Sequence, residues 1–178
     1  LRQSPDPALQ EAADMLRGDV MDPGGWYYQQ LELGYNYRIT DIACALGASQ
    51  MDKLDRFLER RRQIAGKYDE AFADIPQIKT PWQQEGCQSG WHLYMIQTME
   101  RSRREVFDGL RQAGIGVNVH YIPVYRHPYY QRNGYAGVHC LNAEAFYERA
   151  VSLPIFPGLT GSQQDYVIEH VIKECTAD

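Results

Sequence analysis

Apolar residues recur at helical spacing over a long stretch that begins near residue 40. Thr40 is a suitable N-cap, and Asp41 lies in the first turn, where the helix dipole favours a negative charge. The apolar positions that follow are Ile42, Leu46, Leu54, Phe57, Leu58, Ala65, Tyr68 and Phe72. This spacing predicts one helix from about residue 41 to about residue 73. Such a helix is longer than the average helix of about 11 or 12 residues. Helices of this length often span two lobes of a protein or line a subunit contact.

Between residues 91 and 121 the pattern alternates between strand and helix. Residues 91–98 are predicted to form a strand, and residues 115–121 a second one. Between them, Ser102 and Glu105 have the spacing of a capping box, and Gly114 is a suitable helix stop. Strand, helix and strand with short connections predict helices packed on a sheet, which is an α/β architecture.

The last third is predicted to hold two more helices and an extended segment. Residues 120–130 form a proline-punctuated loop rich in rings and imidazoles, a kind of loop that often faces a ligand. Asn142 is expected to cap a short helix that ends near Ala150, and residues 153–159 to form a strand or extended link. Ser162 opens the pattern of a final helix, whose inward positions are Val167, Ile168, Val171 and Ile172.

The first forty residues lead into a polar and aromatic segment. Residues 6–18 weakly predict a short helix, and residues 22–35 a turn followed by an extended run. Residues 34–38 then present an amide, a guanidinium and two phenol rings just before the long helix. Because a helix N-terminus attracts anions, Asn36 and Arg38 predict an anion site. The alternative, that they only turn and solvate the chain, remains equally open.

Composition narrows the possible functions. The 178 residues fit one domain, and the net charge of −5 disfavours nucleic-acid binding. We interpret the run Arg60-Arg61-Arg62 as a solvated helix face. The four cysteines include no C-x-x-C pair, which argues against structural zinc and predicts a reduced, cytoplasmic protein. No apolar run approaches the roughly 18 residues of a membrane span, and the first residue is Leu1, so we expect a soluble piece of a longer polypeptide.

No motif reveals the chemistry from the residues alone. His120, His127 and His139 lie in one region, but their spacing matches no common zinc motif, so no metal site is predicted. The sequence also lacks a nucleophile elbow, a phosphate loop and a dinucleotide fingerprint, and paired carboxylates cannot be identified. These observations predict an α/β domain with an anion-facing segment, and no particular reaction.

One long run, ELGYNYRITDIACALG from Glu32 to Gly47, is more specific than these patterns. Further stretches follow it in a fixed order, at residues 91–94, 114–125, 127–130 and 153–160. Together they resemble the DegT/DnrJ/EryC1/StrS family of sugar-nucleotide aminotransferases, over nearly everything after Trp26. The Ala-Cys-Ala-Leu-Gly variant is most similar to the branch that makes a precursor of pseudaminic acid from a UDP-linked 4-keto-6-deoxy-N-acetyl-altrose.

The resemblance implies the type I fold of pyridoxal-phosphate-dependent aminotransferases. Residues 1–39 would be the end of the large domain and a connector, residues 40–75 the interdomain helix, and residues 76–178 the small C-terminal α/β domain, a small sheet with helices packed on it. In this family a lysine of the large domain holds the cofactor as a Schiff base. The lysines present match no such motif; they are Lys53, Lys67, Lys79 and Lys173. The Schiff-base lysine would therefore lie outside this chain, which alone should be inactive.

The resemblance also implies roles for five residues in a homodimer with shared active sites. Asn36 would bind the phosphate of pyridoxal 5'-phosphate in the other subunit. Arg38 would lie near the diphosphate of the substrate, where its planar guanidinium suits paired oxygens. Tyr35, His120 and Tyr121 would face the nucleotide sugar, and glutamate would donate the amino group.

Two classes of function remain open. The first is the C-terminal part of a glutamate-dependent transaminase that acts on a 4-keto-6-deoxy UDP-sugar. The second is a non-catalytic dimerisation or binding fragment, or a family member that catalyses dehydration of the sugar. A longer polypeptide that shows the colour of bound cofactor would favour the first class. A natural start near Leu1 without colour would favour the second.

Overall fold

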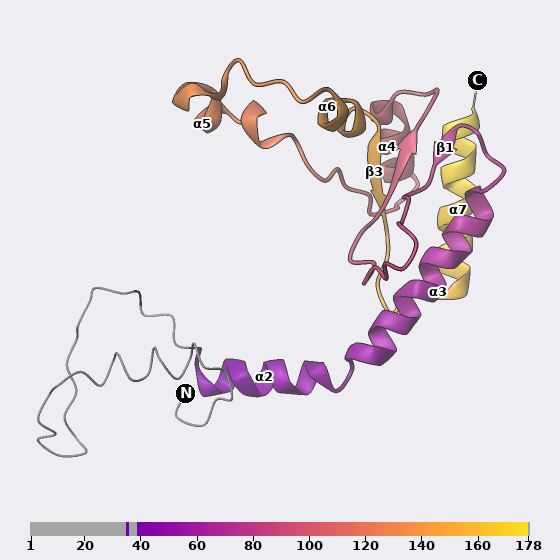
Figure 1. Cartoon of the computed structure of the whole chain (residues 1–178). Helices are drawn as coiled ribbons and strands as arrows, with labels where there is room; N and C mark the ends of the chain where they lie inside the picture. Colours follow the sequence, from indigo (N-terminus) through magenta and orange to yellow (C-terminus); the bar gives the residue numbers. More distant parts are fainter. Residues whose placement is uncertain (1–34, 36–38, 178) are drawn as a thin grey trace, which may run out of the picture. The chain divides into compact units, whose positions relative to one another are not determined.

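The computed structural model describes Tyr35 and residues 39–177 (Figure 1). The chain divides into two compact units, Leu1–Ala45 and Leu46–Asp178. The helix predicted at residues 6–18 and the extended run before Tyr35 lie outside the described residues, as do Asn36 and Arg38. The fold can therefore be compared with the predictions mainly from residue 39 onward.

The long helix predicted at residues 41–73 is observed as two helices. Helix α2 covers Asp41–Met51, and helix α3 covers Leu54–Phe72. The break falls at Lys53, whose N–H donates to the carbonyl of Gln50 at 3.0 Å, a tighter turn than an α-helix makes. The prediction of one unbroken helix was wrong, and the break lies at neither Gly47 nor Gly66, the two glycines within the predicted helix.

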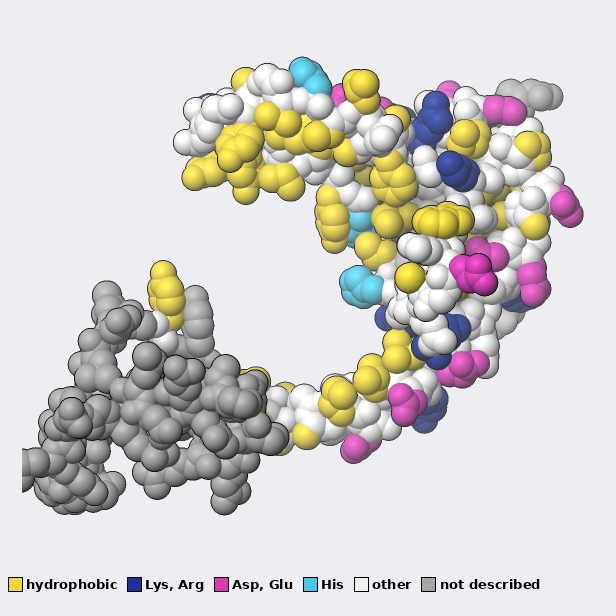
Figure 2. All heavy atoms as spheres, viewed as in Figure 1, with side chains coloured by type: hydrophobic (Ala, Val, Ile, Leu, Met, Phe, Trp, Pro, Cys, Tyr) yellow, Lys and Arg dark blue, Asp and Glu magenta, His cyan; other side chains and the backbone are white. Residues whose placement is uncertain are grey.

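The two helices differ in burial. No residue of α2 is buried, and Ile42 and Leu46 expose 77% and 62% of their surface. Figure 2 shows apolar side chains along this helix. In α3, by contrast, Ile64, Tyr68 and Phe72 are at most 1% exposed. The apolar face of α3 therefore belongs to the core, whereas that of α2 has no cover among the described residues.

A three-stranded antiparallel sheet forms the centre of the larger unit (Figure 1). Its strands, in spatial order, are β1 (Ile78–Lys79), β2 (Tyr94–Thr98) and β3 (Ala150–Leu153). In β2, buried and half-buried residues alternate, as in a strand that buries one face. All four residues of β3 are buried, which is typical of a strand covered on both faces.

The predicted strands are right only in part. The strand predicted at residues 91–98 begins at Tyr94, and the one predicted at residues 115–121 is reduced to one bridge between Asn118 and Ser152. Helix α6 covers Leu141–Tyr147, and the side chain of Asn142 does not cap it. The chain then enters β3 at Ala150, where the helix was expected to end. Pairing between segments that lie far apart in the sequence decided where these strands begin and end.

The helices at residues 103–112 and 161–176 confirm most of the local predictions. Helix α4 (Arg103–Gln112) begins with the predicted capping box of Ser102 and Glu105. Gly114 follows it with a φ of 76°, a conformation that suits glycine. Helix α7 (Gly161–Thr176) is capped by Thr160, two residues before the predicted start. Its predicted inward positions are buried or pack on the core, as predicted: Val167, Ile168, Val171 and Ile172.

The segment between Asn118 and α6 contains short helical turns in place of the predicted loop. They are η1 (Val124–Arg126), α5 (Pro128–Tyr130) and η2 (Gln131–Tyr135). Glu144 of α6 ties this segment down, because it accepts a hydrogen bond from the hydroxyl of Tyr125 at 2.8 Å and pairs with Arg126 at 2.9 Å. Among the helices that the structure describes, none combines the length and the apolarity that crossing a membrane requires.

Candidate functional site

His120 and Tyr121 lie directly after the bridge that joins Asn118 to β3. The bridge is double, with N–H to O distances of 2.8 and 3.3 Å between Asn118 and Ser152. The Nδ1 atom of His120 lies 2.7 Å from the Oγ atom of Ser152. The ring of Tyr121 meets that of His120 edge-on, with 4.5 Å between the ring centroids. The sheet edge therefore holds two of the predicted site residues together.

The contact with Ser152 decides which nitrogen of His120 can meet a ligand. Ser152 is only 4% exposed, and its hydroxyl is engaged with Nδ1, so Nε2 is the ring nitrogen left for other partners. Tyr121, which is 71% exposed, offers a phenol beside it. The pair can position a polar ligand by hydrogen bonds to an imidazole and a hydroxyl.

Ser152 was not among the predicted site residues. The signal that could have found it is a lone hydroxyl within the apolar run of residues 150–153, since a buried polar side chain needs a hydrogen-bond partner. That partner is His120, which is 32 residues away in the sequence. Spacing along the chain could not have indicated the pair.

The other three predicted site residues belong to the first unit, Leu1–Ala45. Tyr35 is 84% exposed. Asn36 and Arg38 lie outside the described residues. The predicted anion site ahead of the long helix therefore stays a prediction. Among the described residues, no group of three His, Cys, Asp or Glu is arranged to hold a metal ion.

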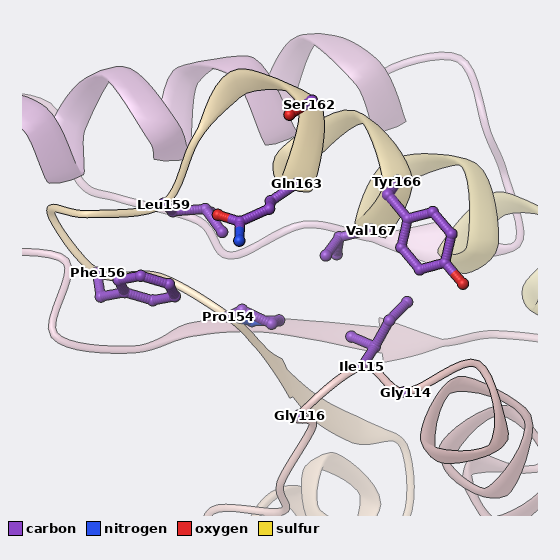
Figure 3. Close-up of a pocket in the computed structure, with 10 residues that line it drawn as sticks. All are labelled: Gly114, Ile115, Gly116, Pro154, Phe156, Leu159, Ser162, Gln163, Tyr166 and Val167. Atoms are coloured by element: carbon purple, nitrogen blue, oxygen red, sulfur yellow. The ribbon is translucent and has the colours of Figure 1, made fainter.

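An apolar cavity of about 550 Å³ lies elsewhere, between α7 and the loop that follows β3 (Figure 3). In Figure 3, Ile115 and Tyr166 border it from opposite sides, with Phe156 near one end. Two of its polar atoms are already engaged: the side-chain oxygen of Gln163 accepts from the N–H of Thr160, and the hydroxyl of Tyr166 donates to a carbonyl. Neither His120 nor Tyr121 lines this cavity, so the largely apolar hollow and the polar candidate site are separate places.

Two arginines of the run at residues 60–62 bind main-chain carbonyls, which corrects their interpretation as a solvated face. Arg60 donates to the carbonyl of Leu159 at 2.7 Å. Arg61 donates to the carbonyls of Trp91 and Ile155 at 2.8 and 3.0 Å. Both side chains are half-buried. The reason is tertiary: the loops before β2 and after β3 bring unpaired carbonyls to this part of α3.

Pyridoxal phosphate, which the resemblance implies, needs an amine in a sheltered site. The Nζ atom of Lys67 pairs with Asp165 at 2.5 Å, and Lys79 and Lys173 are exposed. None of the four lysines, all of which the structure describes, lines the cavity of Figure 3 or any of three further cavities elsewhere among the described residues. The described residues therefore do not build a covalent site for this cofactor.

Comparison with known sequences gives a consistent family. Residues 3–172 match the DegT/DnrJ/EryC1/StrS aminotransferase family. The chain is 40% identical over 154 residues to the spore coat polysaccharide biosynthesis protein SpsC of Bacillus subtilis, covering 83% of this chain and 40% of that protein. It is also 40% identical over 132 residues to the UDP-4-amino-4,6-dideoxy-N-acetyl-beta-L-altrosamine transaminase of Campylobacter jejuni, covering 72% of this chain and 35% of that protein. The chain thus spans less than half the length of these relatives.

Solved structures agree with this result. Helicobacter pylori PseC, an aminotransferase involved in the biosynthesis of pseudoaminic acid, matches with a TM-score of 0.82 at 26% identity, over 97% of this chain and 47% of that one. The PLP-form of the putative sugar aminotransferase Spr1654 from Streptococcus pneumoniae matches with a TM-score of 0.76 at 31% identity, over 84% and 39%. The aminotransferases of this family depend on pyridoxal phosphate. The match over residues 3–172 shows that this chain belongs to the DegT/DnrJ/EryC1/StrS aminotransferase family.

Proposed function

We propose that this chain is the C-terminal part of an aminotransferase that moves the amino group of glutamate to a 4-keto-6-deoxy UDP-sugar. The observation that carries the proposal is the family match over residues 3–172. The similarity to the C. jejuni transaminase and to PseC supports a substrate of the pseudaminic acid pathway or of a related surface glycan. Residues 1–39 are then the end of the large domain, residues 40–75 the interdomain segment, and residues 76–178 the small domain.

The catalytic lysine comes from polypeptide outside this sequence in this proposal. Two observations support it: none of the four lysines lines a cavity among the described residues, and the chain spans only 35 to 40% of the two curated relatives. Pyridoxal phosphate, when bound, supplies the electron sink for amino transfer. The present chain contributes binding and positioning groups, and by itself it has no transaminase activity.

The described residues suggest how these groups act. His120, held through Nδ1 by Ser152, presents Nε2 to the nucleotide sugar, and the exposed hydroxyl of Tyr121 binds beside it. Asn36 donates its amide to the cofactor phosphate across a homodimer interface, and Arg38 and Tyr35 bind the diphosphate and the sugar. The last three roles follow from the family resemblance.

The test is made on the polypeptide as its own genome encodes it. Its intact mass and the visible absorbance of bound pyridoxal phosphate are measured first. It is then incubated with glutamate and a 4-keto-6-deoxy UDP-sugar, and the products are separated. We expect colour, 2-oxoglutarate and an amino sugar, and no turnover by the 178-residue chain alone. A colourless protein, or loss of water from the sugar without amino transfer, would overturn the proposal.

The role of Asn36 can be tested separately. Asn36→Ala in the intact enzyme should weaken retention of pyridoxal phosphate by roughly 2-fold to 10-fold, because one neutral hydrogen bond to the phosphate is lost. Dialysis followed by absorbance measures the retained cofactor. Asn142→Ala is the matched control, since Asn142 is an exposed amide on α6. Equal retention in the Asn36 variant and the wild type would remove Asn36 from the site.

A further inference from the structure

Three arginines from the start of α3 line a second cavity, of about 700 Å³. They are Arg56, Arg60 and Arg61, and Phe57 completes the helical side. The opposite side is the loop after β3, at residues 157–158. A volume of this size falls within the range of roughly 300 to 1,000 Å³ typical of small-molecule sites.

The positive charges in this cavity are not neutralised by acidic side chains. Within the part of the chain that the structure describes, no Asp or Glu forms an ion pair with Arg56, Arg60 or Arg61. The arginine next along α3 behaves differently, because Arg62 pairs with Glu59 at 3.8 Å and does not line the cavity. Three like charges that share one hollow favour a bound anion.

The partners that these arginines do have leave donors free. The carbonyls of the two loops engage one terminal nitrogen each of Arg60 and Arg61, and the other terminal nitrogen of Arg60 donates to the side-chain oxygen of Gln63 at 3.4 Å. Each guanidinium carries five N–H donors, so further donors remain on both side chains. Among the described residues, the side chain of Arg56 has no hydrogen-bond partner, and its guanidinium carbon lies 5.5 Å from the centre of the Phe57 ring. Two arginines are thus fixed in direction, and the third is free to close on a ligand.

The position on the helix adds to the attraction. Arg56 is the third residue of α3, within the turn where unpaired N–H groups create a partial positive charge. Asp55 and Glu59 are the nearest acidic residues in the sequence, and neither lines the cavity. Planar guanidinium groups bind the paired oxygens of phosphate better than a single ammonium would.

We infer that this cavity binds an oxyanion of the phosphate class. The same chemistry has two sources, a free inorganic phosphate or pyrophosphate and the diphosphate of a nucleotide. The nucleotide source rests on the proposed function, whereas the oxyanion site does not. The apolar ring of Phe57 and the size of the cavity leave room for more than the phosphate group itself.

Direct binding tests the inference on the full chain. Pyrophosphate, UDP, uridine and glutamate are each titrated by calorimetry at low and at moderate salt. We expect saturable, salt-sensitive binding of pyrophosphate and no binding of uridine. Tighter binding of UDP than of pyrophosphate identifies the nucleotide source, and equal binding identifies the free oxyanion. No binding of pyrophosphate, or a preference for glutamate, would overturn the inference.

A matched pair of variants separates the site from general charge. Arg56→Gln should weaken pyrophosphate binding about tenfold, because it removes a charged donor from the cavity. Arg62→Gln removes the same charge from the same helix, six residues after Arg56 and outside the cavity. It should leave binding unchanged. Arg56 and Arg62 are both exposed, and neither binds a main-chain carbonyl among the described residues, so both variants should fold, which circular dichroism checks. Equal losses in the two variants would show non-specific attraction and defeat the inference.

The outcome does not depend on amino transfer. An intact enzyme that transfers the amino group normally, in a protein whose cavity binds no pyrophosphate, would defeat only this inference. A chain that binds pyrophosphate through Arg56, in a protein without transaminase activity, would defeat only the proposed function.

Discussion

Helices α2 and α3 follow one another in the chain. Among the described residues, only α3 buries its apolar side chains in the core. Tyr68 of α3 packs on Tyr94 of β2, with 4.9 Å between the ring centroids, and its hydroxyl donates to the carbonyl of Pro154 at 2.9 Å. In α2, Ile42 and Leu46 remain exposed. Helical spacing indicates which residues share a face of a helix, and it does not indicate what covers that face.

The two helices also differ in composition. Asp41 is the only charged residue of α2, whose other positions are small, apolar or uncharged polar residues. In α3, charged residues alternate with the buried stripe, as in a helix with one face in water. A helix with so few charges is typical of a segment that other parts of a protein cover. In the proposed enzyme, we expect those parts to come from the rest of the aminotransferase and its partner subunit.

Cysteine reactivity should give the largest difference between the two regions. Cys44 in α2 is exposed, whereas Cys175 in α7 is buried, and burial raises the pKa of its thiol to about 12. Iodoacetamide should therefore modify Cys44 quickly and Cys175 only through unfolding. For an unfolding free energy of about 5 kcal/mol, the modification of Cys175 is slower by more than about a thousandfold.

A time course by peptide mass spectrometry measures both rates in one sample. Cys87 and Cys140, which are also exposed, serve as internal controls, and urea should remove the protection of Cys175. Protection of Cys44 to the same degree as Cys175 would break the comparison, because it would mean that α2 is covered in solution. Fast modification of Cys175 would mean that α7 does not pack as described.

Truncation of one apolar side chain in each helix should give the next largest difference. Phe72→Ala in α3 should lower the free energy of unfolding by about 3 to 5 kcal/mol, because Phe72 is 1% exposed and stacks on Tyr68. Leu46→Ala in α2 should change it by no more than about 0.5 kcal/mol. Urea titration monitored by circular dichroism measures both. A loss above about 2 kcal/mol for the Leu46 variant would show that α2 packs on part of this chain.

The features predicted correctly from the sequence are mostly local. The capping box of Ser102 and Glu105 is a pattern of four residues, and the stop at Gly114 depends on one conformation. The inward positions of α7, such as Val167, follow from spacing within one helix. In each case the residues that decide the structure lie within a few positions of one another.

The features that were missed depend on partners distant in the sequence. Strand β3 is buried on both faces, so its residues do not alternate, and such a short apolar run is ambiguous between helix and strand. The carbonyl of Leu159 that Arg60 binds lies 99 residues further along the chain. The break at Lys53 contains neither glycine nor proline, the residues that usually reveal one.

The candidate site shows the same division. His120 and Tyr121 are neighbours in the sequence, so any fold brings them together, and the resemblance identified both. Ser152, which orients the imidazole, becomes visible only once β3 pairs with Asn118. The cavity lined by Arg56, Arg60 and Arg61 likewise depends on the loop after β3, which returns to α3 after about a hundred residues. The resemblance identified His120 and Tyr121, the arginine run was taken for a solvated face, and only the fold identified the partners of these side chains.

Removal of one helix cap in each region should give the smallest difference, and it separates local from global stability. The hydroxyl of Ser102 accepts from the N–H of Glu105 at the start of α4, and that of Thr40 accepts from the N–H of Ala43 at the start of α2, both at 3.3 Å. Ser102→Ala should lower the free energy of unfolding by about 1 kcal/mol, since α4 packs on the core through Val106.

Thr40→Ala loses a similar hydrogen bond but should leave the unfolding midpoint in urea unchanged. Because no residue of α2 is buried, its fraying does not require the core to open. Its cost should therefore appear only as faster hydrogen exchange of the amides of Ala43 and Cys44, which donate to Thr40 in the first turn of α2. In the Ser102 variant, amide exchange should instead accelerate throughout the core elements that open by global unfolding. Equal shifts of the urea midpoint in the two variants would mean that α2 unfolds together with the core, and its exposed face would then need a partner within this chain.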